Sequence, residues 1–78
     1  MNSKAFDTDH KFGQHIRRLR MERNWTQEQM VAKLQLIGYD ITRGALAKIE
    51  SGTRHTYLDD LLALQKVLNI SFDELMAF

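Results

Sequence analysis

Two basic residues near the middle of the chain, Arg43 and Lys48, have small neighbours. The guanidinium of Arg43 can donate two parallel hydrogen bonds to the edge of a guanine, and the ammonium of Lys48 can reach a guanine or a phosphate. Gly44, Ala45 and Ala47 lie between them and offer almost no hydrogen-bonding groups, so a helix carrying them can sit deep in a DNA groove. The pattern favours DNA contact over catalysis, and its alternative is a pair of solvated cations on an exposed face.

Residue types that support catalysis or metal binding are missing or scattered. The chain has no cysteine, which excludes disulfides, thiolate nucleophiles and thiolate zinc sites. His10, His15 and His55 are dispersed and have no acidic companions at the spacing of metal ligands. The sequence also contains no Ser, His and Asp set and no Gly-rich phosphate loop. We therefore expect no enzymatic activity, no metal and no cofactor.

The charges are distributed unevenly along the chain. Between Lys11 and Arg54 there are nine basic and four acidic side chains, whereas the remainder has two basic and six acidic ones. This asymmetry fits a polyanion facing the middle of the chain, although ordinary solvated helix faces can also produce it.

The 78 residues suffice for one domain, and no apolar run is long enough to cross a bilayer. We expect a cytoplasmic protein with no membrane partner.

Apolar residues recur at intervals of three and four and proline is absent, so the sequence predicts an all-α chain. Three predicted helix starts combine a polar N-cap with an apolar staple, at Thr26, Thr42 and Ser71. The first helix is expected to end at Asn24, which tolerates the left-handed conformation. A fourth helix is expected to start near Thr56, and its many leucines predict a central position in the fold.

Three segments together resemble the Cro and phage-repressor type of helix-turn-helix domain, the XRE family. They are TQEQM starting at Thr26, ITRGALAKIESG ending at Gly52, and the stretch from Leu61 to Leu75, which closes with NISFDEL. The resemblance covers most of the chain. It implies a five-helix, lambda-repressor-like DNA-binding domain over residues 10–78. Independently of the resemblance, the polar residues 1–9 are expected to form a flexible leader.

The resemblance also implies how the domain contacts DNA, with the third helix in the major groove and the start of the second on the phosphate backbone. Implied base contacts are Arg43, Gly44, Ala47 and Lys48, the last about 140° around the helix from the first. Implied phosphate contacts are Thr26, Gln27, Ser51, Thr53 and Arg54. At Gln27 the free amides of a helix start already attract a phosphate oxygen, and the alternative is an ordinary solvent-exposed residue. Arg20 and Glu50 are implied to form a structural ion pair.

The chain departs from the family pattern in two places. Between Leu34 and Glu50 it has about five more residues than a tight helix-turn-helix, around Gln35 to Asp40. We expect an added turn on the second helix and a lengthened helix-turn-helix connection. Val31 also stands where the family usually has alanine. Both changes can alter the angle between the second and third helices.

The end of the chain is rich in apolar residues. Phe72, Leu75, Met76 and Phe78 predict a homodimer surface, because exposed apolar patches often mark association. The alternative is that they fold back onto the first and fourth helices.

We expect a sequence-specific transcriptional regulator, more specifically a repressor, that binds double-stranded DNA as a homodimer and can have a regulatory protein partner. The alternative function is an antitoxin-like or adaptor module that keeps the fold and binds a protein.

Overall fold

A computed structural model describes the backbone of residues 3–78 and the side chains from residue 7 onward. Over these residues the chain forms five helices and no strand, which confirms the predicted all-α class. The helices are α1 (Ser3–Glu22), α2 (Gln27–Leu36), α3 (Arg43–Ser51), α4 (Leu58–Leu68) and α5 (Phe72–Leu75).

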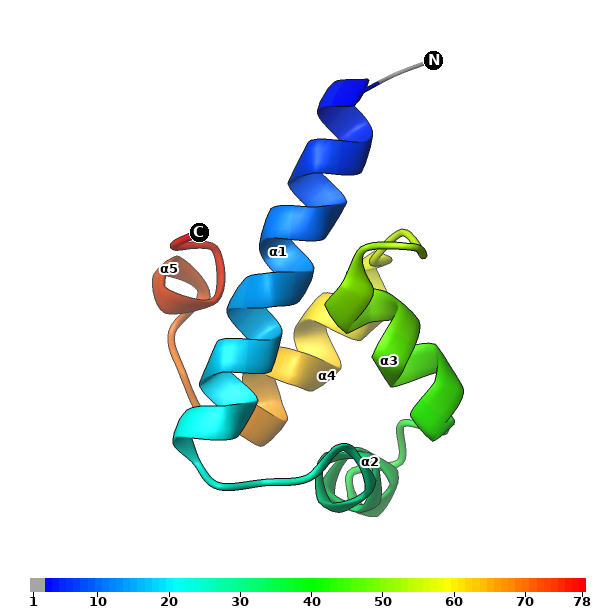
Figure 1. Ribbon diagram of the computed structural model, residues 1–78. Coiled ribbons are helices and arrows are strands. Elements are labelled where there is room, and N and C mark those ends of the chain that lie inside the picture. Colours follow the sequence, from blue (N-terminus) through cyan, green and yellow to red (C-terminus); the bar gives the residue numbers. More distant parts are fainter. Residues whose placement is uncertain (1–2) are drawn as a thin grey trace.

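The long helix α1 runs through the middle of the fold, with α5 on one side of it and α3 on the other (Figure 1). In the same view α2 is seen along its axis and α3 from the side, so these two helices cross steeply. The first turns of α1 extend beyond the other helices. This arrangement leaves the outer side of α3 free of covering helices.

The predicted helix starts are confirmed by their capping hydrogen bonds. The Thr26 hydroxyl accepts from the Gln29 amide at 3.0 Å, and the Gln29 side chain accepts from the Thr26 amide at 2.8 Å, which completes a capping box. The Thr42 hydroxyl accepts from Ala45 N at 3.0 Å, and the Ser71 hydroxyl from Glu74 N at 3.0 Å. Each cap satisfies amides that a helix start otherwise leaves unpaired, so the starts of α2, α3 and α5 are set locally.

The ends of α1 and α3 also follow the sequence signals. Asn24 has φ 59° and Gly52 has φ 77°, the left-handed conformation that terminates helices. Between α2 and α3 the chain runs through residues 37–42, longer than the three or four residues of a tight turn. Gly38, with φ 87°, makes the bend, and Gln35 Nε2 donates to Ile41 O at 3.2 Å. The lengthened connection is therefore confirmed.

The core is formed by apolar side chains from all five helices. Its buried members are Phe12, Ile16, Met30, Val31, Leu34, Ile41, Leu46, Ile49, Ala63, Leu64, Leu68 and Leu75. Helix α4 contributes less than its leucine content predicted, because Leu58 and Leu62 are largely exposed. They occupy the face of α4 that points away from Leu64 and Leu68, so they form part of the surface.

Helices α1 and α3 approach each other almost backbone to backbone. A methyl group added at Gly13 would lie 2.2 Å from Ile49 O and 2.5 Å from Glu50 O. At the end of α3, a methyl group at Gly52 would lie 2.5 Å from the Cα of His10. Only glycine permits such approaches, so these two positions fix the closest packing in the domain.

The sequence predicts a leader at residues 1–9, and in the structure helix α1 already begins at Ser3, within that segment. Polarity alone does not prevent a helix, and no glycine or proline precedes Gly13 to interrupt it. Asp9 is in addition paired with His55, which follows α3 (Oδ2–Nδ1, 2.5 Å). Met1 and Asn2 lie outside the described residues.

Among the described helices, none is both long and apolar enough to cross a membrane.

Candidate nucleic-acid interface

Helix α3 has one buried face and one open face. Leu46 and Ile49 point into the core. On the other side Arg43, Gly44 and Lys48 are exposed and Ala47 is half-buried. The four residues implied as base contacts therefore share one open surface, with Arg43 near one edge and Lys48 near the other.

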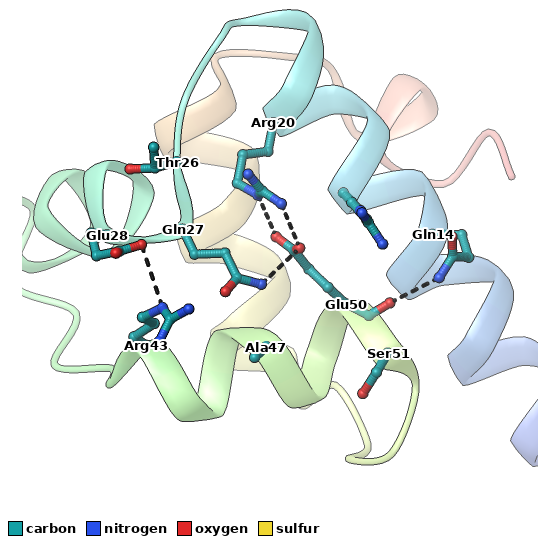
Figure 2. Close-up of a pocket in the computed structure, with 10 residues that line it drawn as sticks. Gln14, Arg20, Thr26, Gln27, Glu28, Arg43, Ala47, Glu50 and Ser51 are labelled. Carbon is teal, nitrogen blue, oxygen red and sulfur yellow. Dashed lines mark hydrogen bonds and ion pairs between the residues drawn. The ribbon is translucent and has the colours of Figure 1, made fainter.

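Beside this face lies a depression formed by α1, the start of α2 and α3 (Figure 2). Its lining is largely polar and includes three guanidinium groups. The lining residues are Gln14, Arg17, Arg20, Thr26, Gln27, Glu28, Arg43, Ala47, Glu50 and Ser51. Three separate helices thus bring hydrogen-bond donors and positive charge to one place.

A buried ion pair forms the floor of the depression. Arg20 donates to Glu50 through Nε at 2.7 Å and Nη2 at 2.9 Å, with only 8% and 3% of the two residues exposed (Figure 2). A third Arg20 hydrogen bond, from Nη1 to Trp25 O at 2.7 Å, reaches the loop before α2. The hydrogen bond to Glu50 raises the pKa of Arg20 despite burial, so its charge is permanent. The pair joins α1 to α3.

Gln27 is the first residue of α2 and is half-buried. Its Nε2 donates to Glu50 Oε1 at 3.2 Å, so one amide hydrogen is used to extend the ion pair (Figure 2). Because a primary amide carries two donor hydrogens, the second one remains available to a ligand. Thr26, beside it, is exposed and has its hydroxyl occupied by the cap.

Arg43 forms an exposed ion pair with Glu28 of α2, Nε to Oε1 at 3.4 Å. The two side chains are 65% and 69% exposed, so water screens the attraction and its worth is at most about 1 kcal/mol. Arg43 is therefore loosely held and can exchange Glu28 for another anionic or acceptor group.

Arg54, by contrast, is committed to the protein. Its Nη1 donates to the buried carboxylate of Asp60 at 2.8 Å and to His55 O at 3.0 Å, and its guanidinium lies 5.5 Å from the ring centre of Tyr57. The hydrogen bond to Asp60 raises the pKa of Arg54. The structure thus does not support Arg54 as a free phosphate contact, because a buried carboxylate would lose its counter-charge. Ser51 and Thr53 are exposed, with their hydroxyls 2.9 Å apart.

Comparison with known proteins identifies the family. A helix-turn-helix family model matches residues 16–75. The chain belongs to the Cro and phage-repressor type of helix-turn-helix domain. The chain is also similar to the HTH-type transcriptional activator BcrR of Enterococcus faecalis, with 30% identity over 67 residues. That alignment covers 86% of this chain but only 30% of BcrR. No solved structure matches the chain significantly.

Within this helix-turn-helix domain, two residues of the depression were not anticipated. Gln14 and Arg17 lie on the exposed side of α1, and Gln14 Nε2 donates to Glu50 O at 3.4 Å. Gln14, Arg17 and Arg20 follow one another at intervals of three residues, which places all three on one helix face. That spacing is visible in the sequence and links both residues to Arg20, which the sequence analysis assigned only to a structural ion pair.

The end of the helix-turn-helix domain divides into buried and exposed residues. Leu75 is 0% exposed and belongs to the core, so its assignment to a dimer surface is wrong. A four-residue helix can turn one side chain fully inward while its neighbours face out. Phe72, Met76 and Phe78 are 51%, 39% and 43% exposed. Phe78 is not wholly free, since its ring packs edge-on against Phe12 at 5.5 Å.

Among the side chains that the structure describes, no three acidic or histidine residues gather closely enough to hold a metal ion. His15, the most buried histidine, instead uses its Nε2 in a 2.8 Å contact with Glu74 O, which links α1 to α5.

Proposed function

We propose that this domain binds double-stranded DNA sequence-specifically, inserting α3 into the major groove, and thereby regulates transcription. One observation carries the proposal: the open face of α3 stands beside the amino end of α2, so base-reading and phosphate-binding groups point the same way. Arg43 and Lys48 supply donors to bases, while Gly44 and Ala47 permit close approach.

Phosphate contacts in this proposal come from the rim of the depression. The amides that start α2, the second amide hydrogen of Gln27 and the hydroxyls of Ser51 and Thr53 are suited to phosphate oxygens. We add Arg17, an exposed cation on α1 that lines the same depression, in place of Arg54. Because only two long polar side chains stand on the open face of α3, DNA shape also contributes to specificity.

We further propose that the domain acts as a homodimer. The second copy would cover an apolar area around Met76 and Phe78, which with Phe12 and Leu61 line a shallow hollow. Two copies related by a two-fold axis would bind half-sites about one helical turn apart. Sedimentation of the protein over a range of concentrations, with and without its selected duplex, tests this assembly.

Selection of bound sites from random duplexes, followed by titration at two salt concentrations, tests DNA binding. A specific DNA binder loses affinity steeply with salt. We expect Arg43→Ala to relax preference at one base position and Gln27→Ala to weaken all sequences alike. Lys66→Ala is the matched control, since Lys66 is an exposed cation on α4 outside the depression. An antitoxin-like or adaptor protein would instead select no sequence and show no salt dependence.

The direction of regulation is a separate proposal. Occupation of a promoter is by itself enough to block transcription, so we propose a repressor in the cytoplasm, where its DNA target would lie. A reporter with the selected site overlapping the promoter should fall in output when the protein is present. A rise in output from a site placed upstream would assign activation instead, which is the role that the name of the relative BcrR gives to that protein.

A further inference from the structure

Asp60, on the first turn of α4, is the most enclosed carboxylate in the described structure at 1% exposure. Its Oδ1 accepts a hydrogen bond from the Tyr39 hydroxyl, and its Oδ2 accepts from Arg54 Nη1 and Tyr57 N, both at 2.8 Å. The Arg54 Nη2 atom lies 3.5 Å from Oδ1. Both oxygens are therefore satisfied, as a buried carboxylate requires.

The donors come from the two chain segments that flank α3. Tyr39 lies in the lengthened connection, four residues before the start of α3 at Arg43, and Arg54 follows the end of α3 at Ser51 by three residues. Asp60 thus ties the entry and the exit of α3 to one point on α4. The Arg20 and Glu50 pair holds the same helix to α1 from its other side.

We propose that Asp60 is a positioning residue that sets the orientation of α3, and with it the base preference of the domain, by holding Tyr39 and Arg54 together. This inference rests on the proposed DNA-binding function. It also assigns a role to the longer connection. The added residues carry the Tyr39 hydroxyl, which holds the amino end of α3, and this end bears Arg43 and Gly44.

The expected effect follows from the geometry of base reading. A bidentate contact from Arg43 to guanine needs both hydrogen bonds in place and discriminates by about 1–3 kcal/mol, or roughly five- to 150-fold. Contacts to phosphates tolerate small shifts because the attraction is long-ranged and carries no sequence information. Releasing the amino end of α3 should therefore reduce specific binding and spare non-specific binding.

Tyr39 offers a spectroscopic signature of the contact. Burial, together with the hydrogen bond to Asp60, raises the pKa of Tyr39 to about 12. For Asp60, burial acts to raise the pKa, but hydrogen bonds from Arg54, Tyr39 and the Tyr57 amide outweigh it and hold the pKa below its ordinary value. Tyrosinate absorbance should therefore show that Tyr39 titrates late, and Asp60→Asn should make it titrate earlier.

The test compares Tyr39→Phe, which removes only the hydroxyl, with Tyr57→Phe, whose ring is exposed and whose contact with Asp60 is through the backbone. Affinities for the selected duplex and a scrambled duplex are measured at a temperature where circular dichroism shows all variants folded. We expect Tyr39→Phe to lower the specific-to-scrambled ratio about tenfold with an unchanged salt slope, and Tyr57→Phe to leave the ratio unaltered.

The outcomes separate this inference from the proposed function. If Tyr39→Phe binds both duplexes with unchanged ratio, or weakens both equally, Asp60 does not position α3 and the inference fails alone. If the unaltered protein distinguishes no duplex from any other, the proposed function fails and the inference fails with it. A lowered ratio for Tyr39→Phe but not for Tyr57→Phe supports the inference.

Discussion

Replacing Glu50 by glutamine should strongly destabilise the domain, whereas the same replacement at Glu28 should not. Both carboxylates pair with an arginine, but the pair of Glu50 with Arg20 is buried and that of Glu28 with Arg43 is exposed. Glu50→Gln keeps the shape and leaves a buried, permanently charged guanidinium without its counter-charge, which typically costs about 3–5 kcal/mol. Glu28→Gln should cost less than about 1 kcal/mol because water already screens that pair.

The size of the effect makes it measurable. A domain of this length has a free energy of unfolding of about 4–12 kcal/mol, so Glu50→Gln removes a large share of it. Its Tm should fall by more than about 12 °C, at about 4–8 °C per kcal/mol for small domains. Urea unfolding is followed by far-UV circular dichroism, with the fluorescence of Trp25 as a second probe. It gives the free energy of unfolding of both variants, which can then be compared directly.

A double substitution separates the buried charge from the packing. Arg20→Met combined with Glu50→Leu removes both charges and keeps apolar volume, and it should recover most of the stability lost in Glu50→Gln. The reasoning is refuted if Glu28→Gln and Glu50→Gln lose equal stability, or if the double variant is less stable than Glu50→Gln.

Four further outcomes are expected. Gly13→Ala should lower the free energy of unfolding by at least the 1–3 kcal/mol typical of overpacking, since its methyl group would collide with the backbone of α3, and near-wild-type urea unfolding would contradict this. Glu28→Gln should tighten duplex binding about two- to fivefold at low salt by freeing Arg43, and weaker binding would argue against a competing ion pair. The raised pKa of Tyr39 means that its protonated form is favoured by folding, so stability present below pH about 10 should fall by about 2–3 kcal/mol as pH rises to about 12, a loss absent from Tyr39→Phe. Met76→Lys should abolish dimers in sedimentation without lowering Tm, and persistent dimers would place the interface elsewhere.

The helix starts could be predicted because their determinants are local. Thr26 and Gln29 are three residues apart, so one short segment contains both halves of the capping box. The left-handed ends at Asn24 and Gly52 are likewise properties of single residues. Since these signals also fix the order and length of α2 and α3, they were sufficient for the fold class.

The parts that the sequence did not reveal depend on partners distant in the chain or on which side of an element faces inward. Arg54 looked like a free cation because nothing nearby indicated that Asp60 would be buried beneath it. Leu75 and Phe72 lie on the same short helix, and only the packing of α5 against the core decides that Leu75 turns inward. For the same reason Leu58 and Leu62, assigned to a central helix by composition, are on its outer side.

The glycine contacts between α1 and α3 have a consequence for engineering the domain. Because Gly13 and Gly52 let main chain touch main chain, the pose of α3 against α1 is set by atoms that every amino acid shares. The outward-facing positions 43, 44, 47 and 48 take no part in those contacts. Libraries randomised at these four positions should therefore keep the packing of α3 against α1 while changing which DNA sequences are bound. Substitution of either glycine would instead disrupt that packing.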